Sequence, residues 1–427
     1  MEKLTRRDFF GQSALTAAAT LAPAMFVAAR QSDSPGEPIN CGVMGLGRGM
    51  AHVASILDSP QARLKYVCDV DRRRLEAGMK NVENRRVTHM PTPLSDFRRM
   101  LDDPHLHAVF IATCNHWHAP ATIMACAAGK HVYVEKPGSH NPHEGELMVA
   151  AARKYRRVVQ MGNQRRSWPA IIEAIDKLRA GAIGRVLYAR AWYNNQRGSI
   201  GKGKHVPVPD YLDYDLWQGP APERPYKDNL IPYNWHWHWH YGGGELANNG
   251  IHALDLVRWG LGVDYPLKVS YIGGRFHYDD DQETPDTGTA AFHFGSVGGT
   301  WECSSCLPRR EEKHPFVAFY GSEGALHIVG TGYVIYDLKG EKVAEGRGEG
   351  GDLIHIKNFL ECIASGKKPN SEIEEGQKST LLCHLGNISY RVGRTIYFDP
   401  QTRKIVNDHE AMNYWQREYR PGWEPHL

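Results

Sequence analysis

Two short motifs in the first part of the chain have the residue types and spacing of a dinucleotide-binding site. Gly45-Leu46-Gly47 follows an apolar run, and Glu135-Lys136-Pro137 begins 90 residues after Gly45. The glycines permit a sharp turn and let the backbone approach a pyrophosphate at the start of the next helix. Lys136, at the end of a fifth strand, would lie beside the reactive end of a bound nicotinamide. Either motif alone is weak, but together they predict a nicotinamide-dependent oxidoreductase.

Asp69 predicts which nicotinamide cofactor is bound. It lies 24 residues beyond Gly45, where an acid accepts the ribose hydroxyls of NAD and repels the 2′-phosphate of NADP. The glycine fingerprint is incomplete, because Met50 holds the third glycine position and Gly49 precedes it. Arginines 72–74 follow closely and would tolerate NADP. The sequence therefore favours NAD over NADP, and a simple turn residue is the alternative role for Asp69.

Residues 39–161 alternate between strands and helices and predict a doubly wound parallel sheet, a Rossmann domain of α/β class. The expected strands are 39–44, 64–68, 108–113, 131–134 and 158–161. One expected helix follows the glycine turn and ends at residue 57, and four others span 72–81, 94–102, 120–128 and 144–156. In such a sheet the ligand lies beyond the carboxyl ends of the strands.

Residues 162–427 have the pattern of an α+β substrate and oligomerisation domain with a largely antiparallel open sheet. Segments rich in aromatic and β-branched residues predict its strands. These strands are 186–193, 268–276, 287–294, 299–303 and 316–320, and helices are expected at 353–364 and 377–391.

The N-terminus has the pattern of a twin-arginine export signal. Arg6-Arg7 precedes Phe9 and Phe10, and an apolar run of small residues extends to residue 29. This predicts a signal peptide over 1–29, a linker over 30–38 and export to the periplasm with no stable membrane anchor. An ordinary secretory signal and a plain amphipathic segment are the alternatives.

Composition narrows the partners and the redox chemistry. With 51 basic and 48 acidic residues, the charge is too balanced to indicate binding to nucleic acid. The eight cysteines are scattered through apolar runs and have the pattern of buried hydrophobic residues. Cys303 and Cys306 are the only close pair, and a disulfide or redox role for them stays open.

Several motifs together resemble the glucose-fructose oxidoreductase / inositol dehydrogenase (Gfo/Idh/MocA) family, in particular its exported members. The resemblance is carried by the glycine turn, residues 113–118 (TCNHWH), Glu135-Lys136-Pro137, residues 216–222 (LWQGPAP) and residues 250–255 (GIHALD). It implies a tightly bound nicotinamide cofactor, a sugar or cyclitol substrate, and homodimers or homotetramers packed through the open sheet. The cofactor-binding positions that it implies are Gly45, Gly47, Arg48, Gly49, Met50, Asp69, Thr113, Asn115, His118, Glu135, Lys136 and Arg165.

Family members commonly pair the motif lysine with an aspartate and, four residues later, a histidine. Here those two positions are Asn248 and His252. Lys136 would orient a substrate hydroxyl and stabilise oxyanion charge, and a neutral His252 would accept the proton. Asn248 cannot act as a base but can hydrogen-bond a hydroxyl. The alternatives are a solvated loop lysine for Lys136 and, for His252, a core histidine that caps a backbone group.

Residues 235–240 alternate Trp and His (WHWHWH). On a strand, histidines at i and i+2 would share one face, which would suggest a metal site, but only Glu245 offers a nearby acidic ligand. Aromatic faces beside imidazoles equally suit sugar rings, and structural packing is the third option. We therefore expect no metal and take Trp168, Trp235, His236 and His238 as the candidates for substrate binding.

Three functions are compatible with these patterns. The first is an exported sugar or cyclitol dehydrogenase. The second is a glycosidase that uses NAD transiently, through oxidation, elimination of the glycosidic bond and restoration of the cofactor. The third is a non-catalytic sugar-binding protein that kept the fold.

Overall fold

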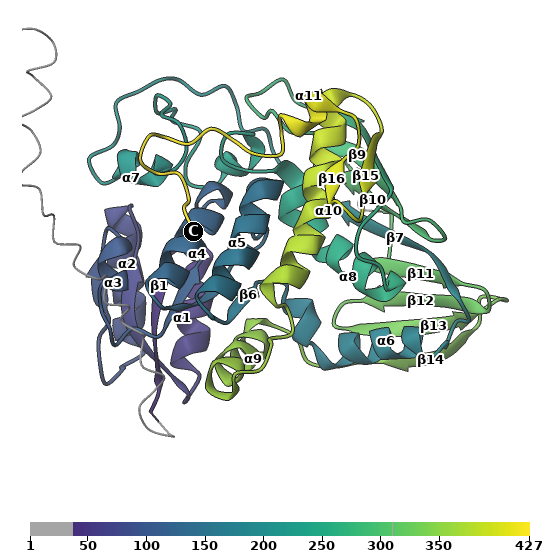
Figure 1. Cartoon of the computed structure of the whole chain (residues 1–427), viewed down its shortest axis with the longest axis horizontal. Coiled ribbons are helices and arrows are strands. Elements are labelled where there is room, and N and C mark those ends of the chain that lie inside the picture. Colours follow the sequence, from purple (N-terminus) through teal and green to yellow (C-terminus); the bar gives the residue numbers. More distant parts are fainter. Residues whose placement is uncertain (1–36, 310) are drawn as a thin grey trace, which may run out of the picture.

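The first domain is a six-stranded, entirely parallel sheet. A parallel sheet is what the sequence predicts, but strand β3 is not among the five expected strands. The computed structural model describes residues 37–309 and 311–427, and its first sheet has the order β3-β2-β1-β4-β5-β6 (Figure 1). The strands are β1 Ile39–Met44, β2 Ala62–Cys68, β3 Thr92–Leu94, β4 Ala108–Ile111, β5 His131–Val134 and β6 Val159–Met161, and the helices are α1 Gly49–Leu57, α2 Arg72–Asn84, α3 Arg98–Leu101, α4 Asn115–Ala127 and α5 Pro142–Lys154.

One predicted helix is largely wrong. The segment 94–102 holds the end of β3 and only a four-residue helix, α3 Arg98–Leu101. The Asp96 carboxylate accepts the backbone N–H of Arg98 and holds its guanidinium, so a turn separates the strand from the helix. Phe97 and Met100 are both buried and are three residues apart, which is the spacing of one helix face. This spacing suggested a longer helix than the structure has.

The second domain is a ten-stranded, mostly antiparallel sheet, which confirms the α+β expectation. Its order is β14-β13-β12-β11-β7-β10-β9-β8-β15-β16, and only β7 and β10 pair in parallel. The strands are β7 Val186–Asn194, β8 Lys268–Gly274, β9 Thr287–His293, β10 Gly298–Ser304, β11 Val317–Gly321, β12 Gly324–Val329, β13 Gly332–Asp337, β14 Lys342–Gly346, β15 Ile396–Asp399 and β16 Lys404–Ile405.

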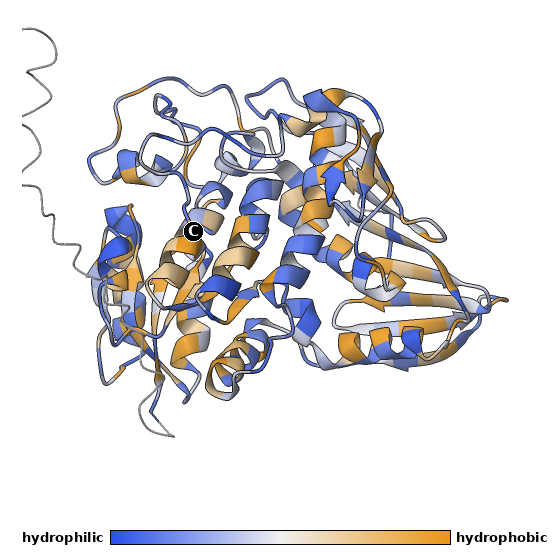
Figure 2. Cartoon of the chain, viewed as in Figure 1, coloured by the Kyte–Doolittle hydropathy of each residue, from blue (hydrophilic) through white to orange (hydrophobic). Residues whose placement is uncertain are grey.

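Three helices pack on this second sheet: α6 Pro169–Arg179, α8 Ile251–Leu261 and α10 Ile373–Val392. Figure 2 shows apolar residues running along these strands and alternating with polar residues on α6. Shorter elements lie in the connections. They are η1 Gln164–Ser167, α7 Tyr214–Gln218, η2 Asn234–Trp237, η3 Leu246–Gly250 (a π turn) and α11 His409–Met412.

Helix α9 Asp352–Ser365 returns to the first domain. It packs against α1, and its residues Ile356, Phe359 and Leu360 are fully buried with those of β1 and α1. The N-terminal sheet is therefore completed by a segment from the last fifth of the chain.

All eight cysteines are buried and none forms a disulfide. Among the residues that the structure describes, no helix is both long and apolar enough to cross a membrane. The predicted signal peptide and all of the linker but residues 37 and 38 lie outside the described residues.

Candidate functional site

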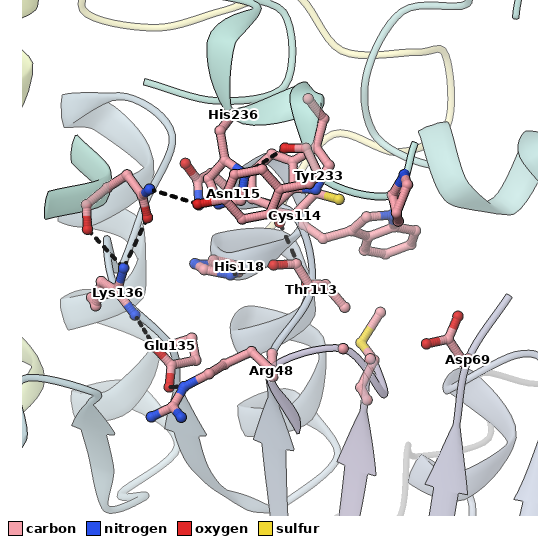
Figure 3. A pocket seen from close by; sticks show the side chains of 18 of the residues that line it. Arg48, Asp69, Thr113, Cys114, Asn115, His118, Glu135, Lys136, Tyr233 and His236 are labelled. Carbon is pink, nitrogen blue, oxygen red and sulfur yellow. Dashed lines mark hydrogen bonds and ion pairs between the residues drawn. The ribbon is translucent and has the colours of Figure 1, made fainter. Parts of the chain in front are cut away.

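A cavity of about 810 Å³ lies at the carboxyl ends of the parallel strands, between the two domains. Figure 3 shows Asp69 and Lys136 at opposite sides of this pocket, with Tyr233 and His236 above them. Fifteen of the predicted site residues line it: Gly45, Gly47, Arg48, Asp69, Thr113, Asn115, His118, Glu135, Lys136, Arg165, Trp168, Trp235, His236, Asn248 and His252.

Three of the predicted residues are not part of the lining. Gly49 begins α1, and a Cβ there would come within 2.9 Å of Val43, so this glycine serves the packing of helix on sheet. Met50 packs against the hydrophobic cluster of the first domain. The Nδ1 atom of His238 lies 3.6 Å from the Glu283 carboxylate, away from the cavity.

The glycine turn is shaped for close approach. Gly45 has φ +89°, and a Cβ there would lie 2.6 Å from the Ala112 carbonyl oxygen. A Cβ on Gly47 would lie 2.5 Å from Nη1 of Arg74. Side chains at these two positions would therefore collide with Ala112 and Arg74, so glycine is needed for the turn itself. The turn leads into the N-terminus of α1, where a pyrophosphate would bind, and Arg74 lies beside it.

Asp69 is fixed by the backbone around it. Its carboxylate accepts the N–H groups of Leu46 at 2.7 Å and Asp71 at 2.9 Å. Burial raises the pKa of Asp69, and these two hydrogen bonds oppose the rise. Asp69 thus stabilises the glycine turn through these hydrogen bonds, at the edge of the parallel sheet where a ribose would bind.

Glu135 lies at the centre of the cavity floor and contacts several basic side chains. Its carboxylate lies 3.1 Å from Nε of Arg48 and 3.0 Å from Nε2 of His52, and Arg48 also contacts Asp352 at 2.6 Å. Burial alone would raise the pKa of Glu135, but the His52 hydrogen bond and the nearby charges of Arg48 and Lys136 lower it overall. Glu135 therefore stays ionised and places negative charge beside Lys136.

The Lys136 ammonium is held by Asn248. Nζ donates to the Asn248 backbone oxygen at 2.7 Å and to its Oδ1 at 3.0 Å. Burial lowers the pKa of Lys136, and Glu135 opposes that shift. Asn248 lies in the π turn η3, a local irregularity that often marks functional sites. Two of the three ammonium N–H groups are thus used, which leaves one for a ligand.

His252 lies in the first turn of α8, directly after the π turn. Burial, followed by the positive charge of Lys136, lowers its pKa well below the ordinary value. The imidazole is therefore neutral at pH 7 and can accept a proton. The structure thus brings Lys136, Asn248 and His252 together in one cavity.

The Trp-His segment is not a strand, so the expectation that its histidines share a face is wrong. Residues Asn234–Trp237 form the 3₁₀ helix η2, and the three histidines diverge. His236 lines the cavity, His238 faces Glu283, and Nε2 of His240 bonds to the Pro222 carbonyl oxygen at 2.8 Å. Within residues 37–309 and 311–427, no group of three His, Cys, Asp or Glu side chains is arranged to hold a metal ion.

His236 adds a second neutral imidazole to the cavity. It stacks on Trp235 with ring centroids 3.6 Å apart, and its Nδ1 donates to the Tyr233 carbonyl oxygen at 2.7 Å. That tautomer leaves a lone pair on Nε2. Burial lowers the pKa of His236 to about 3, so the lone pair is present at neutral pH.

Arg165 is held by aromatic rings, and no acid among the described residues pairs with it. Its guanidinium lies 4.6 Å from the Trp168 ring and 4.0 Å from the Phe316 ring, and Nη1 donates to the Gly330 carbonyl oxygen at 2.8 Å. Burial lowers its pKa to about 10. Trp168 in turn donates its indole N–H to the Gly351 oxygen at 3.2 Å.

Some of the lining was missed by sequence reasoning. Trp117, Trp217 and Tyr233 belong to the cavity wall, and Trp117 and His116 both bond to the Trp217 carbonyl oxygen at 3.0 Å. Trp117 and Trp217 stood within the motifs quoted for the family resemblance, which was a usable signal. Tyr233 lies in an irregular loop with no period to reveal it.

The sequence matches three domain models of one family, and the matches together span most of the chain. Residues 39–163 match the GFO/IDH/MocA oxidoreductase family with an NAD-binding Rossmann fold, residues 171–327 match a GFO/IDH/MocA C-terminal domain, and residues 309–425 match the C-terminal α/β domain of the oxidoreductase family. The predictions of an oxidoreductase and of an NAD cofactor are thereby confirmed.

Characterised relatives are similar over different lengths. The scyllo-inositol 2-dehydrogenase (NAD(+)) of Bacillus subtilis is 24% identical over 78% of this chain and 88% of its own length. The myo-inositol 2-dehydrogenase of Thermotoga maritima is 22% identical over 83% and 97%. The levoglucosan dehydrogenase of Pseudarthrobacter phenanthrenivorans is 40% identical, but over only 23% of this chain and 25% of that enzyme.

Solved structures share the fold at low identity. The aldose-aldose oxidoreductase of Caulobacter crescentus, crystallised with glycerol, aligns with a TM-score of 0.66 at 20% identity and covers 85% of this chain and all of the other. A levoglucosan dehydrogenase in complex with NADH aligns with a TM-score of 0.66 at 19% identity and covers 84% of this chain and 98% of the other.

Proposed function

The chain belongs to the GFO/IDH/MocA oxidoreductase family, and on that premise we propose that it moves hydride between a secondary alcohol of a sugar or cyclitol and NAD. One observation carries the proposal. The Lys136 ammonium, held by Asn248, lines the same cavity as a neutral His252, at the far side from the glycine turn and Asp69. The inositol and levoglucosan dehydrogenases among its relatives suggest the substrate class.

The residues divide the work of oxidising an alcohol. NAD, when bound, supplies the hydride acceptor, and Gly45, Gly47 and Asp69 are the residues that would hold its phosphate and ribose. The remaining N–H of Lys136 donates to the substrate oxygen and stabilises the negative charge that develops on it. His252 takes the hydroxyl proton on its free ring nitrogen while the C–H bond breaks and a ketone forms.

Asn248 makes this site differ electrostatically from one that has a carboxylate in its place. A neutral amide holds the ammonium without cancelling its charge, so Lys136 keeps its full effect on the substrate oxygen. Burial and the same charge depress the pKa of His252, so the imidazole is neutral but is a weaker base than one paired with a carboxylate.

A second candidate function is an NAD-dependent glycosidase, and His236 is the observation that favours it. After oxidation, a second base must remove the acidified proton beside the ketone before the glycosidic bond leaves. His236 lines the same cavity, and its Nε2 lone pair is not needed for the first proton transfer. Dehydrogenation requires only one of the two imidazoles, whereas elimination uses both.

The two candidates are separated by titrating purified protein with free sugars, cyclitols and aryl glycosides. A dehydrogenase accumulates NADH and a keto product, whereas an elimination-type glycosidase releases the aryl alcohol without net NADH. Lys136→Met should abolish either activity, and His236→Gln should abolish only glycoside cleavage. Absence of both products over the whole panel would refute the proposed substrate class.

We also propose that the protein is exported with its cofactor already bound. The support is the Arg6-Arg7 pair before an apolar run, which is typical of a route for folded proteins. Arg6→Lys with Arg7→Lys should retain the protein in the cytoplasm, and Lys3→Arg should not. Equal export of all forms, or exported protein devoid of nicotinamide, would contradict this.

We propose a homodimer or homotetramer formed through the second sheet. The support is apolar side chains exposed on it, among them Ile272, Val343 and Tyr397, which are 80%, 60% and 53% exposed. Light scattering should give two or four times the monomer mass, and Ile272→Asp should lower it. A monomer at micromolar concentration would refute the proposal.

A further inference from the structure

A second cavity, of about 740 Å³, lies outside the site described above and shares no lining residue with it. One wall is a single face of α10, formed by His384, Asn387, Ile388 and Arg391. The rest of the lining comes from four segments: residues 140–142 at the start of α5, residues 222–224, residues 239, 240, 242 and 243, and residues 413, 414 and 416–418 of the C-terminal segment. In Figure 1 the C-terminal segment is the yellow coil that leaves α11 and crosses toward α4.

The Trp-His segment separates the two cavities. His236 lines the first, whereas Trp239 and His240 line the second. The chain after Lys136 does the same, because Lys136 lines the first cavity and His140 and Asn141 line the second. Two segments that the sequence marks as unusual thus each contribute to two cavities.

The lining of the second cavity holds buried polar atoms with no partner. Among the residues that the structure describes, Nδ1 of His140, Nδ2 of Asn141 and Nη1 of Arg417 are buried and make no hydrogen bond. Asn141 is 5% exposed. His384 and Asn387 are 7% and 8% exposed, but both have a partner, because Nε2 of His384 bonds to Ser139 Oγ and Nδ2 of Asn387 donates to the Gly243 carbonyl oxygen. Unsatisfied buried polar atoms are costly, so a ligand toward which these side chains turn would gain hydrogen bonds that the protein alone does not make.

The cavity carries more positive than negative charge. Within residues 37–309 and 311–427, neither Arg224 nor Arg391 has a carboxylate at ion-pair distance, whereas Glu223 pairs with Arg420 at 3.1 Å. Among those same residues, Glu418 is the only acid of the lining without an ion pair. Burial lowers the pKa of His384 to about 3 and of His240 to about 4, so the excess charge comes from the arginines.

The shape and the aromatic rings indicate more than an inorganic ion. Arg391 lies 5.2 Å from the Trp239 ring and 3.8 Å from the Tyr414 ring, so a charged group and flat apolar faces meet at one place. The volume is in the range of sites for small organic ligands. Sugar rings pack on such faces while their hydroxyls use the surrounding amides and imidazoles.

We propose that the second cavity binds a sugar acid, a hydroxylated carboxylate of monosaccharide size. Arg391 and Arg224 receive the carboxylate, Asn141 and His140 bond to hydroxyls, and Trp239 lies against the ring. This site is separate from the oxidoreductase site and holds whether or not the reaction proposed above is performed.

Calorimetric titration with D-glucuronate tests the proposal, with D-glucose and inorganic phosphate as comparison ligands. Asn141→Asp is the sharpest variant, because it keeps the oxygen that caps α5 at the Glu144 N–H while it replaces the unpartnered amide donor by a negative charge. We expect this variant and Arg391→Gln to bind glucuronate about 10- to 100-fold more weakly, as the loss of a charge-assisted bond predicts.

Two controls locate the binding. Arg347→Gln makes the same charge change at an exposed side chain far from this lining and should leave the affinity unchanged. Lys136→Met alters only the first cavity and should leave glucuronate binding intact, which separates failure here from failure of the proposed reaction.

Three results would overturn the proposal: no glucuronate binding, equal binding of glucose or phosphate, or binding lost in Lys136→Met but kept in Asn141→Asp. If one lining variant fails to fold, the other decides.

Discussion

Replacing Lys136 by methionine isolates the ammonium from the rest of the side chain. Methionine keeps an unbranched apolar stem of similar length and removes only the charge and the three donors. In the wild type, two of those donors bond to Asn248 at 2.7 and 3.0 Å, and the third is available to substrate. The substitution should therefore affect the transition state more than the fold or the cofactor site.

The expected magnitudes follow from these contacts. Loss of one preorganised donor to a developing oxyanion costs about 10²- to 10³-fold in kcat. The two Asn248 oxygens lose their donor, which costs about 1–3 kcal/mol of stability. Relief of a buried charge, whose pKa burial lowers, opposes that cost. The free energy of unfolding should thus change by less than about 2 kcal/mol.

Three measurements check this: NADH formation at saturating substrate, NADH binding by fluorescence titration, and urea denaturation. Lys130→Met is a matched control, because Lys130 is 2% exposed and donates to the Asp103 carbonyl oxygen at 2.6 Å, and it does not line the cavity. The control should lose stability and keep kcat. Lys136→Met with normal turnover, or with a loss explained entirely by weaker NADH binding, would refute the assigned role.

Three further predictions concern other parts of the molecule. Asp69→Ala should weaken NAD binding about tenfold. It should also reduce the preference for NAD over NADP, because Arg74 lies beside the turn. Equal losses of affinity for both cofactors in fluorescence titrations would show that Asp69 only stabilises the turn. Burial lowers the pKa of His355 to about 4 against about 6.5 in the unfolded chain, so the unfolded state binds the proton first and stability falls as pH drops from 6.5 to 4. His355→Gln should reduce the slope of the unfolding free energy over that window by up to about 1.4 kcal/mol per pH unit, and an unchanged slope would show that this histidine contributes nothing. Gly219→Ala should destabilise by about 2–4 kcal/mol, because a Cβ would lie 2.0 Å from Trp117 at φ +44°; an unchanged melting temperature would contradict this.

The first domain was predictable because its signals are local. The strand at 39–44 is a largely apolar run, and Gly45 directly after it has the positive φ that the turn requires. Lys136 and Glu135 follow β5 directly, so the alternation of strands and helices already placed them at the cofactor edge.

The upper wall of the cavity was harder to predict, because its geometry is not periodic. Alternating Trp and His imitates a strand, but in a 3₁₀ turn residues i and i+2 point in different directions. Trp235 and Trp237 are both buried, as a strand would also require. The π turn that places Asn248 against Lys136 has no recognisable sequence signature, so only the family resemblance indicated that the two belong together.

The return of α9 has a consequence for how this protein is made. Arg48 and its partner Asp352 are 304 residues apart, and the apolar groove beside α1 stays open until Ile356, Phe359 and Leu360 have been synthesised. A growing chain that has completed all six parallel strands therefore still exposes part of that core to solvent. Because folding of the nucleotide-binding unit must wait for a late segment, we expect the two domains to unfold in one cooperative transition, and a fragment ending near residue 163 to be aggregation-prone.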